Sequence, residues 1–154
     1  MTFSKNAYIS QSVTFLKNNC YSEAYKIAKE FTSLYPDEVI SNYLFSQSAY
    51  FLGKYEESAT AARKAFNLSK NKDDMRVSGL RACLAYYQLK EYQKGISILE
   101  ALENILADED LEQFTFLFHT AMKNPDKASK HLQKMIDFNA KAARNFCTPF
   151  FKLK

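Results

Sequence analysis

A period of about 34 residues constrains the fold of this chain more than any other feature, because such a period is typical of stacked repeat units. An aromatic residue followed three positions later by a small one recurs at Tyr21 with Ala24, Tyr55 with Ser58, and Tyr92 with Gly95. A degenerate fourth copy starts at Pro125, at a similar distance after Tyr92. The shared spacing predicts a repeat architecture.

Each copy is expected to contain two helices. Apolar residues recur at three- and four-residue spacing over 5–18, 37–52, 75–89 and 110–122, which predicts a helix before each tyrosine-bearing segment. Pro36 with Asp37 is expected to open the third helix, and Gly53 is expected to close it in a left-handed cap. Asn124 with Pro125 offers an N-cap followed by a first-turn proline. Each repeat is therefore predicted to be an antiparallel helix pair.

Small residues at matching places explain how the two helices of a pair can approach closely. The first helices carry Ser12, Ser46 and Cys83, and the second helices carry Ala24, Ser58 and Gly95 at the level expected to face them. The tyrosines of the repeat are expected to fill the space beside the turn. The alternative is a generic helical bundle in which these residues coincide by chance, and the shared spacing favours repeats.

The same residues resemble the tetratricopeptide repeat (TPR) family. In the first repeat they are Tyr8, Ser12, Phe15, Tyr21, Ala24, Ala28, Phe31 and Pro36; in the second Phe45, Ser46, Tyr55, Ser58, Ala62 and Ala65; in the third Cys83, Tyr86, Tyr92, Gly95 and Leu99. The family's glycine is replaced by Ser or Cys, its closing proline remains only at Pro36, and Phe116 is bulky where a small residue is usual. Residues 11–102 also show a weak similarity to the N-terminal repeats of anaphase-promoting complex TPR subunits.

The resemblance implies an all-α fold, a right-handed superhelix (α-solenoid) of antiparallel helix pairs. We expect a single domain over 1–154, with repeats at about 5–36, 37–73, 74–108 and 109–138. A C-terminal capping helix at about 139–148 is expected to cover the last repeat, because a terminal repeat must hide its apolar face.

Composition and charge exclude several classes of function. With 21 Lys and Arg against 17 Asp and Glu, the net charge of +4 is too small to require a nucleic-acid or membrane partner. Basic residues gathered in the middle of the chain leave an RNA-associated helical repeat protein as a second alternative; they are Lys64, Lys70, Lys72, Arg76, Arg81 and Lys90. Neither a secretion signal nor a run of about 18 apolar residues is found, and Cys20, Cys83 and Cys147 are widely separated. A cytoplasmic or nuclear protein is expected.

No catalytic, cofactor or metal site is expected from the sequence. The three glycines are scattered, so no phosphate-binding loop can form from them. His119 and His131 lie on different predicted helices, without a second ligand at metal-binding spacing. Cys83 is interpreted as a buried packing residue, and the acidic run 108–110 as a helix start.

The resemblance places the functional surface on the first helices of the pairs, which line a concave groove in this family. By register the groove residues are Ile9, Val13, Leu16, Tyr43, Gln47, Tyr50, Leu80, Leu84 and Tyr87. Most are apolar or aromatic, so a helix or an extended protein segment is the expected partner. The alternative is that the terminal helix fills this groove. The clamp that some TPR proteins use for acidic C-termini is not expected, because Ile9, Val13, Leu44 and Val77 occupy its polar places, and charge reversal at Arg81 is expected to matter little.

The sequence therefore predicts a non-enzymatic interaction module or scaffold, as a subunit of a larger assembly. The first alternative is a small TPR chaperone for hydrophobic secreted or assembly substrates. Self-association is open, because the sequence has no symmetric signal.

Overall fold

The computed structural model describes residues 3–106 and 109–137, and within these ranges every regular element is an α-helix. The chain divides into two compact units, one ending at Glu91 and the other starting at Tyr92. The boundary falls between the two helices of the third predicted repeat. The predicted capping helix at 139–148 lies outside the described residues.

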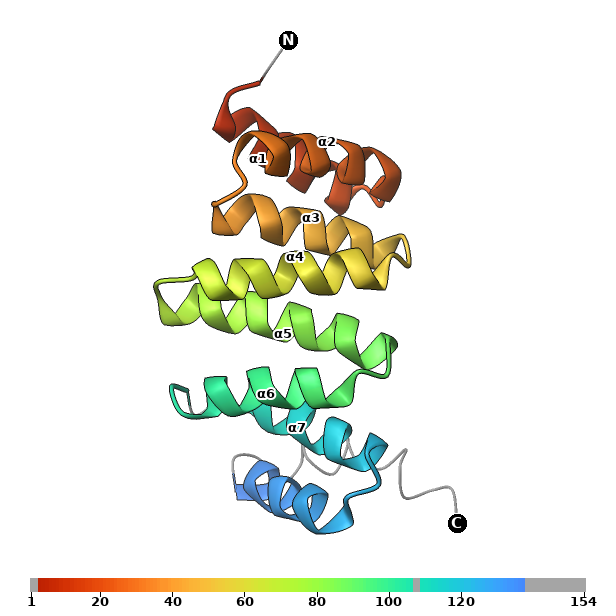
Figure 1. The fold of residues 1–154 in the computed structure, drawn as a ribbon, viewed down its shortest axis with the longest axis vertical. Helices are drawn as coiled ribbons and strands as arrows, with labels where there is room; N and C mark the ends of the chain where they lie inside the picture. Colours follow the sequence, from red (N-terminus) through yellow and green to blue (C-terminus); the bar gives the residue numbers. More distant parts are fainter. Residues whose placement is uncertain (1–2, 107–108, 138–154) are drawn as a thin grey trace. The chain divides into compact units, whose positions relative to one another are not determined.

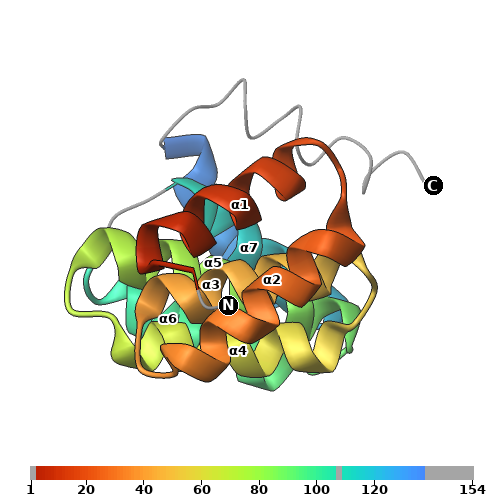
Figure 2. The ribbon, with the colours of Figure 1, turned by 90° about the horizontal axis from the view of Figure 1, so that it is seen from above.

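The first unit contains five helices in antiparallel succession (Figure 1). They are α1 (Lys5–Lys17), α2 (Tyr21–Leu34), α3 (Val39–Phe51), α4 (Tyr55–Leu68) and α5 (Lys72–Gln88). Each helix packs against the next, and α3 also contacts α1 and α5 directly. Therefore α1, α3 and α5 form one layer, and α2 and α4 pack behind it (Figure 2).

The second unit contains α6 (Tyr92–Glu103), α7 (Glu109–Ala121) and a further helix over 125–137. Gly95 allows α6 and α7 to approach each other, because a Cβ atom at this position would collide with the Phe118 ring. Phe116, bulky where the family has a small residue, is buried in a cluster with Ala128 and Met135. The helix over 125–137 thus covers the apolar side of α7.

The turn inside each helix pair repeats the same backbone geometry. A residue with positive φ occurs at Asn19, Gly53, Lys90 and Lys123, two positions before each repeat tyrosine or Pro125. The next amide N–H in each turn donates to the carbonyl five residues earlier, at 2.8–2.9 Å. This bond is the outer hydrogen bond of a Schellman motif. The left-handed cap predicted at Gly53 is confirmed, and it is one of four in the described part of the chain.

Two helices start two or three residues away from the predicted positions, and local hydrogen bonds explain both. α3 begins at Val39 instead of 37, and the side chains of Ser41 and Asn42 bond back to carbonyls within residues 35–38. α5 begins at Lys72 instead of 75, because the Asn71 side chain accepts a hydrogen bond from the Asp74 amide at 2.8 Å. The predicted cap at Asn124 is confirmed, since its side chain accepts from the Lys127 amide at 3.4 Å.

The small residues of the second repeat meet as predicted. The Ser46 hydroxyl donates to the Ser58 carbonyl at 2.7 Å, and the Ser58 hydroxyl donates to the Ser46 carbonyl at 2.8 Å. Both side chains are fully buried, so each polar atom is satisfied by the opposite helix. This reciprocal pair holds α3 and α4 in close contact.

The repeat tyrosines stack beside the turns. Tyr21 stacks on Phe51 with ring centroids 4.7 Å apart, and Tyr55 contacts Tyr50 edge-on at 5.3 Å. Between α2 and α4, the Tyr25 hydroxyl donates to Glu57 at 2.5 Å, which raises the pKa of Tyr25 to about 12. The aromatic residues therefore link α2 to α3 and to α4 as well as filling the turns.

Candidate partner-binding surface

The nine predicted groove residues all lie in the first unit, on α1, α3 and α5, and all are partly exposed. These are Ile9, Val13 and Leu16 on α1; Tyr43, Gln47 and Tyr50 on α3; and Leu80, Leu84 and Tyr87 on α5. The three α1 residues also pack against the buried cluster of Tyr8 and Phe31, so much of their area serves the core. The layer formed by these helices is the candidate surface.

Arg81 occupies the centre of the α3–α5 part of this surface. Its guanidinium lies 5.5 Å from the centroid of the Tyr50 ring and 6.0 Å from those of Tyr43 and Phe51. Tyr50 is also held by Gln88, whose amide donates to the tyrosine hydroxyl at 3.3 Å. Cation–π contacts of this kind fix both the arginine and the rings.

Arg81 therefore has a larger part in this surface than the sequence led us to expect. The arginine orders two of the predicted groove residues, and its buried Nε atom has no hydrogen-bond partner in the described part of the chain. From the sequence, only apolar and aromatic residues of α5 were predicted to line the groove. A signal was present, because Val77, Arg81, Leu84 and Gln88 follow helical spacing along one face.

A pocket of about 680 Å³ opens at one end of the surface, where α3 and α5 begin and α4 ends. Tyr43 belongs both to this pocket and to the ring cluster around Arg81. The apolar part of its wall comes from Val39, Ile40, Tyr43, Leu68 and Val77, and the polar part includes Asp37, Glu38, Lys70, Asn71, Asp73, Asp74 and Ser78. The pocket was not predicted from the sequence.

The acidic groups of the pocket are partly compensated by lysines. Glu38 pairs with Lys5 at 2.8 Å, and Asp37 lies 3.8 Å from Lys64. These pairs are exposed and worth little for stability. They show that Lys64, one of the basic residues considered for RNA binding, faces a carboxylate.

Outside this surface, the reactive and metal-binding residue types occur in two places, a buried cysteine and a cluster of carboxylates with a histidine. Cys83 is fully buried, and burial raises the pKa of its thiol, so the thiol stays protonated near neutral pH. Its interpretation as a packing residue agrees with this setting. In the second unit, Glu103, Glu112 and His131 lie close enough together to hold a metal ion.

In the described ranges, no helix has both the length and the apolar character needed to cross a bilayer.

Comparison with solved structures assigns the fold. A MamA fragment (41-end) from Desulfovibrio magneticus RS-1 superposes with a TM-score of 0.78 at 19% identity, covering 99% of this chain and 96% of that one. TTC0263, a thermophilic TPR protein from Thermus thermophilus, gives 0.72 at 16% identity, covering 94% and 80%. The anaphase-promoting complex assembly Cut9–Hcn1 gives 0.79 at 15% identity, covering 97% of this chain and 30% of that one.

The predicted fold class is thereby confirmed: the chain has the all-helical, TPR-like α-solenoid fold. The similarity to the anaphase-promoting complex is confirmed at the level of fold. No family model matches the sequence, and a comparison with curated proteins finds no match.

Proposed function

We propose that this chain is a non-enzymatic protein–protein interaction module that binds a segment of a partner on the layer formed by α1, α3 and α5. The observation that carries the proposal is the half-exposed aromatic cluster of Tyr43, Tyr50 and Phe51 around Arg81. Partly exposed aromatic rings beside an arginine are the residue types enriched at the energetic centres of protein interfaces.

The geometry of this surface suits a segment with apolar side chains and a few polar ones. Tyr43 and Val77 offer apolar area at the pocket, where Val77 is 41% exposed, and Gln47 is available for backbone hydrogen bonds. Phe51 adds a further exposed ring at the other end of α3. Protein segments that bind such grooves are anchored by a few side chains while the remaining contacts exclude water.

The carboxylates at the pocket favour a protein partner over RNA. Asp37, Glu38, Asp73 and Asp74 line it, and Lys70 is the one basic residue among the lining residues that the structure describes. A phosphate backbone is disfavoured there, because RNA affinity rests largely on the neutralisation of phosphates by Lys and Arg side chains. We therefore do not propose RNA association.

Site-specific photo-crosslinking tests the proposal directly. A photoreactive amino acid replaces Gln47 on the candidate surface, or the exposed Arg63 of α4 as a matched control, in the protein expressed in its native host. We expect a discrete crosslinked protein from position 47 and none from position 63. A single partner recovered in stable stoichiometry supports a scaffold, whereas many unfolded export substrates support the chaperone alternative.

Once a partner is known, alanine substitution measures the contribution of the surface. The double variant Tyr50→Ala with Leu84→Ala is expected to weaken binding by about 3 kcal/mol, while far-UV helicity is retained. The control pair Lys26→Ala with Arg63→Ala removes exposed side chains of α2 and α4 and should leave the Kd unchanged. Equal affinities of the two double variants in calorimetry would refute binding on this surface.

A further inference from the structure

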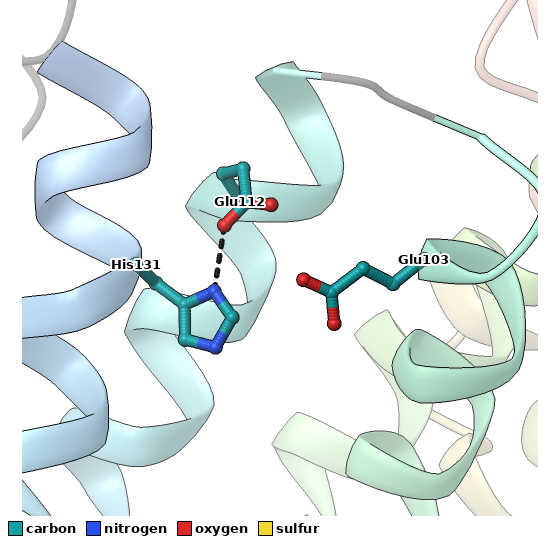
Figure 3. A group of neighbouring side chains, drawn as sticks. All are labelled: Glu103, Glu112 and His131. Carbon is teal, nitrogen blue, oxygen red and sulfur yellow. Dashed lines mark hydrogen bonds and ion pairs between the residues drawn. The ribbon is translucent and has the colours of Figure 1, made fainter. Parts of the chain in front are cut away.

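The second unit holds a largely buried cluster of carboxylate and imidazole groups that the proposed binding surface does not use. Glu103 is the last residue of α6, Glu112 lies in the first turns of α7, and His131 lies on the helix over 125–137. Figure 3 shows the three side chains converging from their three helices, with Nδ1 of His131 2.6 Å from Oε2 of Glu112. One potential ligand atom from each residue lies within 4.8 Å of the others.

The burial of this cluster requires a compensating cation. The side chains of Glu112 and His131 are only 8% and 10% exposed. A buried carboxylate is strongly disfavoured unless a positive charge or a metal ion faces it. The ammonium of Lys134 meets that need here, at 2.5 Å from Glu103 and 3.7 Å from Glu112.

Lys134 is a replaceable partner. Its side chain is 38% exposed on a flexible stem, so its ammonium can move into water, and the buried Glu112 carboxylate then needs another cation beside it. Another cation of higher charge could then bind the carboxylates of Glu103 and Glu112 in the place of the ammonium.

A second imidazole lies directly beside the cluster. The ring of His119 is stacked on that of His131, with centroids 5.5 Å apart and planes inclined by 13°. His119 is only 6% exposed, and its Nδ1 has no hydrogen-bond partner among the residues that the structure describes. A buried nitrogen without a partner is unusual, because such groups are nearly always satisfied. This second observation also points to a ligand beside the cluster.

We propose that Glu103, Glu112 and His131 form a site for a divalent transition-metal cation of the Zn²⁺ class, whose place Lys134 takes in the metal-free protein. Carboxylate oxygen and imidazole nitrogen together suit such an ion, and three protein ligands leave a position for water or for His119 after a side-chain adjustment. Because the ligands come from three helices, a bound ion would link α6, α7 and the helix over 125–137. The sequence offered no sign of this, since residues 103, 112 and 131 have no short metal-binding spacing.

Metal titration of the full chain, first stripped with a chelator, tests the proposal. Zn²⁺ is expected to raise the Tm in a saturable way with one ion per chain, and Co²⁺ is expected to give visible absorption bands at the same stoichiometry. His131→Ala and Glu112→Gln should each weaken Co²⁺ binding at least about tenfold. The matched control is Ser129→Ala, which alters an exposed, uncharged residue on the same helix and should leave the affinity unchanged.

Lys134→Gln separates a metal site from a simple ion-pair network. If the ammonium competes with the metal, this variant binds Co²⁺ at least several-fold more tightly than the natural chain and keeps the Zn²⁺-dependent rise in Tm. This gain does not depend on whether the Glu112 or His131 variants fold. The proposal is overturned if neither the natural chain nor Lys134→Gln shows a Co²⁺ spectrum or a Zn²⁺-dependent Tm, or if His131→Ala binds as tightly as the natural chain.

Discussion

Two buried polar contacts of this chain, one in each unit, join helices of the same architecture in opposite ways. Between α3 and α4, the hydroxyls of Ser46 and Ser58 satisfy each other's backbone carbonyls with neutral groups. Between α7 and the helix over 125–137, the contact is made by Glu112 and His131 and depends on Lys134 for charge balance. The serine pair joins its two helices through neutral groups, whereas the cluster joins its helices through ionisable side chains.

The largest expected effect breaks the serine contact by size. Ser58→Leu inserts three extra carbon atoms where the hydroxyl is fully buried and removes the hydrogen bond that this hydroxyl donates to the Ser46 carbonyl, so the free energy of unfolding should fall by about 3 kcal/mol or more. Urea denaturation followed by circular dichroism measures the change. Arg63→Leu, on the exposed side of α4, should change stability by less than about 0.5 kcal/mol. A loss of stability as large for Arg63→Leu would mean that helix α4 as a whole, and not its serine contact, is sensitive.

A smaller effect is expected when the ionisable cluster is broken. Glu112→Ala leaves His131 without its partner and Lys134 with one carboxylate, which should cost about 1–3 kcal/mol. Hydrogen exchange with mass spectrometry should locate the lost protection in α7 and 125–137. Equal loss of protection across α1–α5 would show that the units do not respond separately.

The turns give the smallest effect and extend the comparison to a feature that both units share. Gly53 has a φ of 75°, and a Cβ atom added there would have no other atom within 4 Å, so Gly53→Ala should cost about 1 kcal/mol through backbone strain alone. Lys90 has a φ of 59°, a conformation that is strained for a residue with a Cβ atom but not for glycine. Lys90→Gly should therefore raise the free energy of unfolding, by up to about 1 kcal/mol.

Thermal and urea unfolding of both turn variants measures these signs. If Lys90→Gly destabilises the chain, the contacts of the lysine side chain outweigh the strain of its backbone. If Gly53→Ala is neutral, the turn after α3 relaxes more readily than its Schellman geometry suggests.

The sequence predicts the helix pairs because their pattern is local and repeated. The spacing of the repeat tyrosines and the small residues facing them define which helices pair, and the Ser46–Ser58 contact follows from that register. Helix starts are less predictable. Asn71 moves the start of α5 by one side-chain hydrogen bond to the Asp74 amide.

The polar features of the sites could not be predicted, because they depend on distances between helices. Arg81 is near Tyr43 and Tyr50 only after α3 and α5 are packed together. Glu103, Glu112 and His131 lie on three different helices and meet only in the folded second unit. Helical periodicity identifies the face on which a residue lies, but it does not identify the charged neighbour opposite.

The left-handed turn residues that the structure describes have a consequence for how this architecture can diverge. Gly53 is a glycine, while the other three are asparagine and lysine. A backbone hydrogen bond to the carbonyl five positions earlier defines the turn without requiring a particular side chain. Homologous chains could therefore replace the signature residues of the repeat and keep the same turns. Their relationship would then be recognised from backbone dihedral angles rather than from sequence.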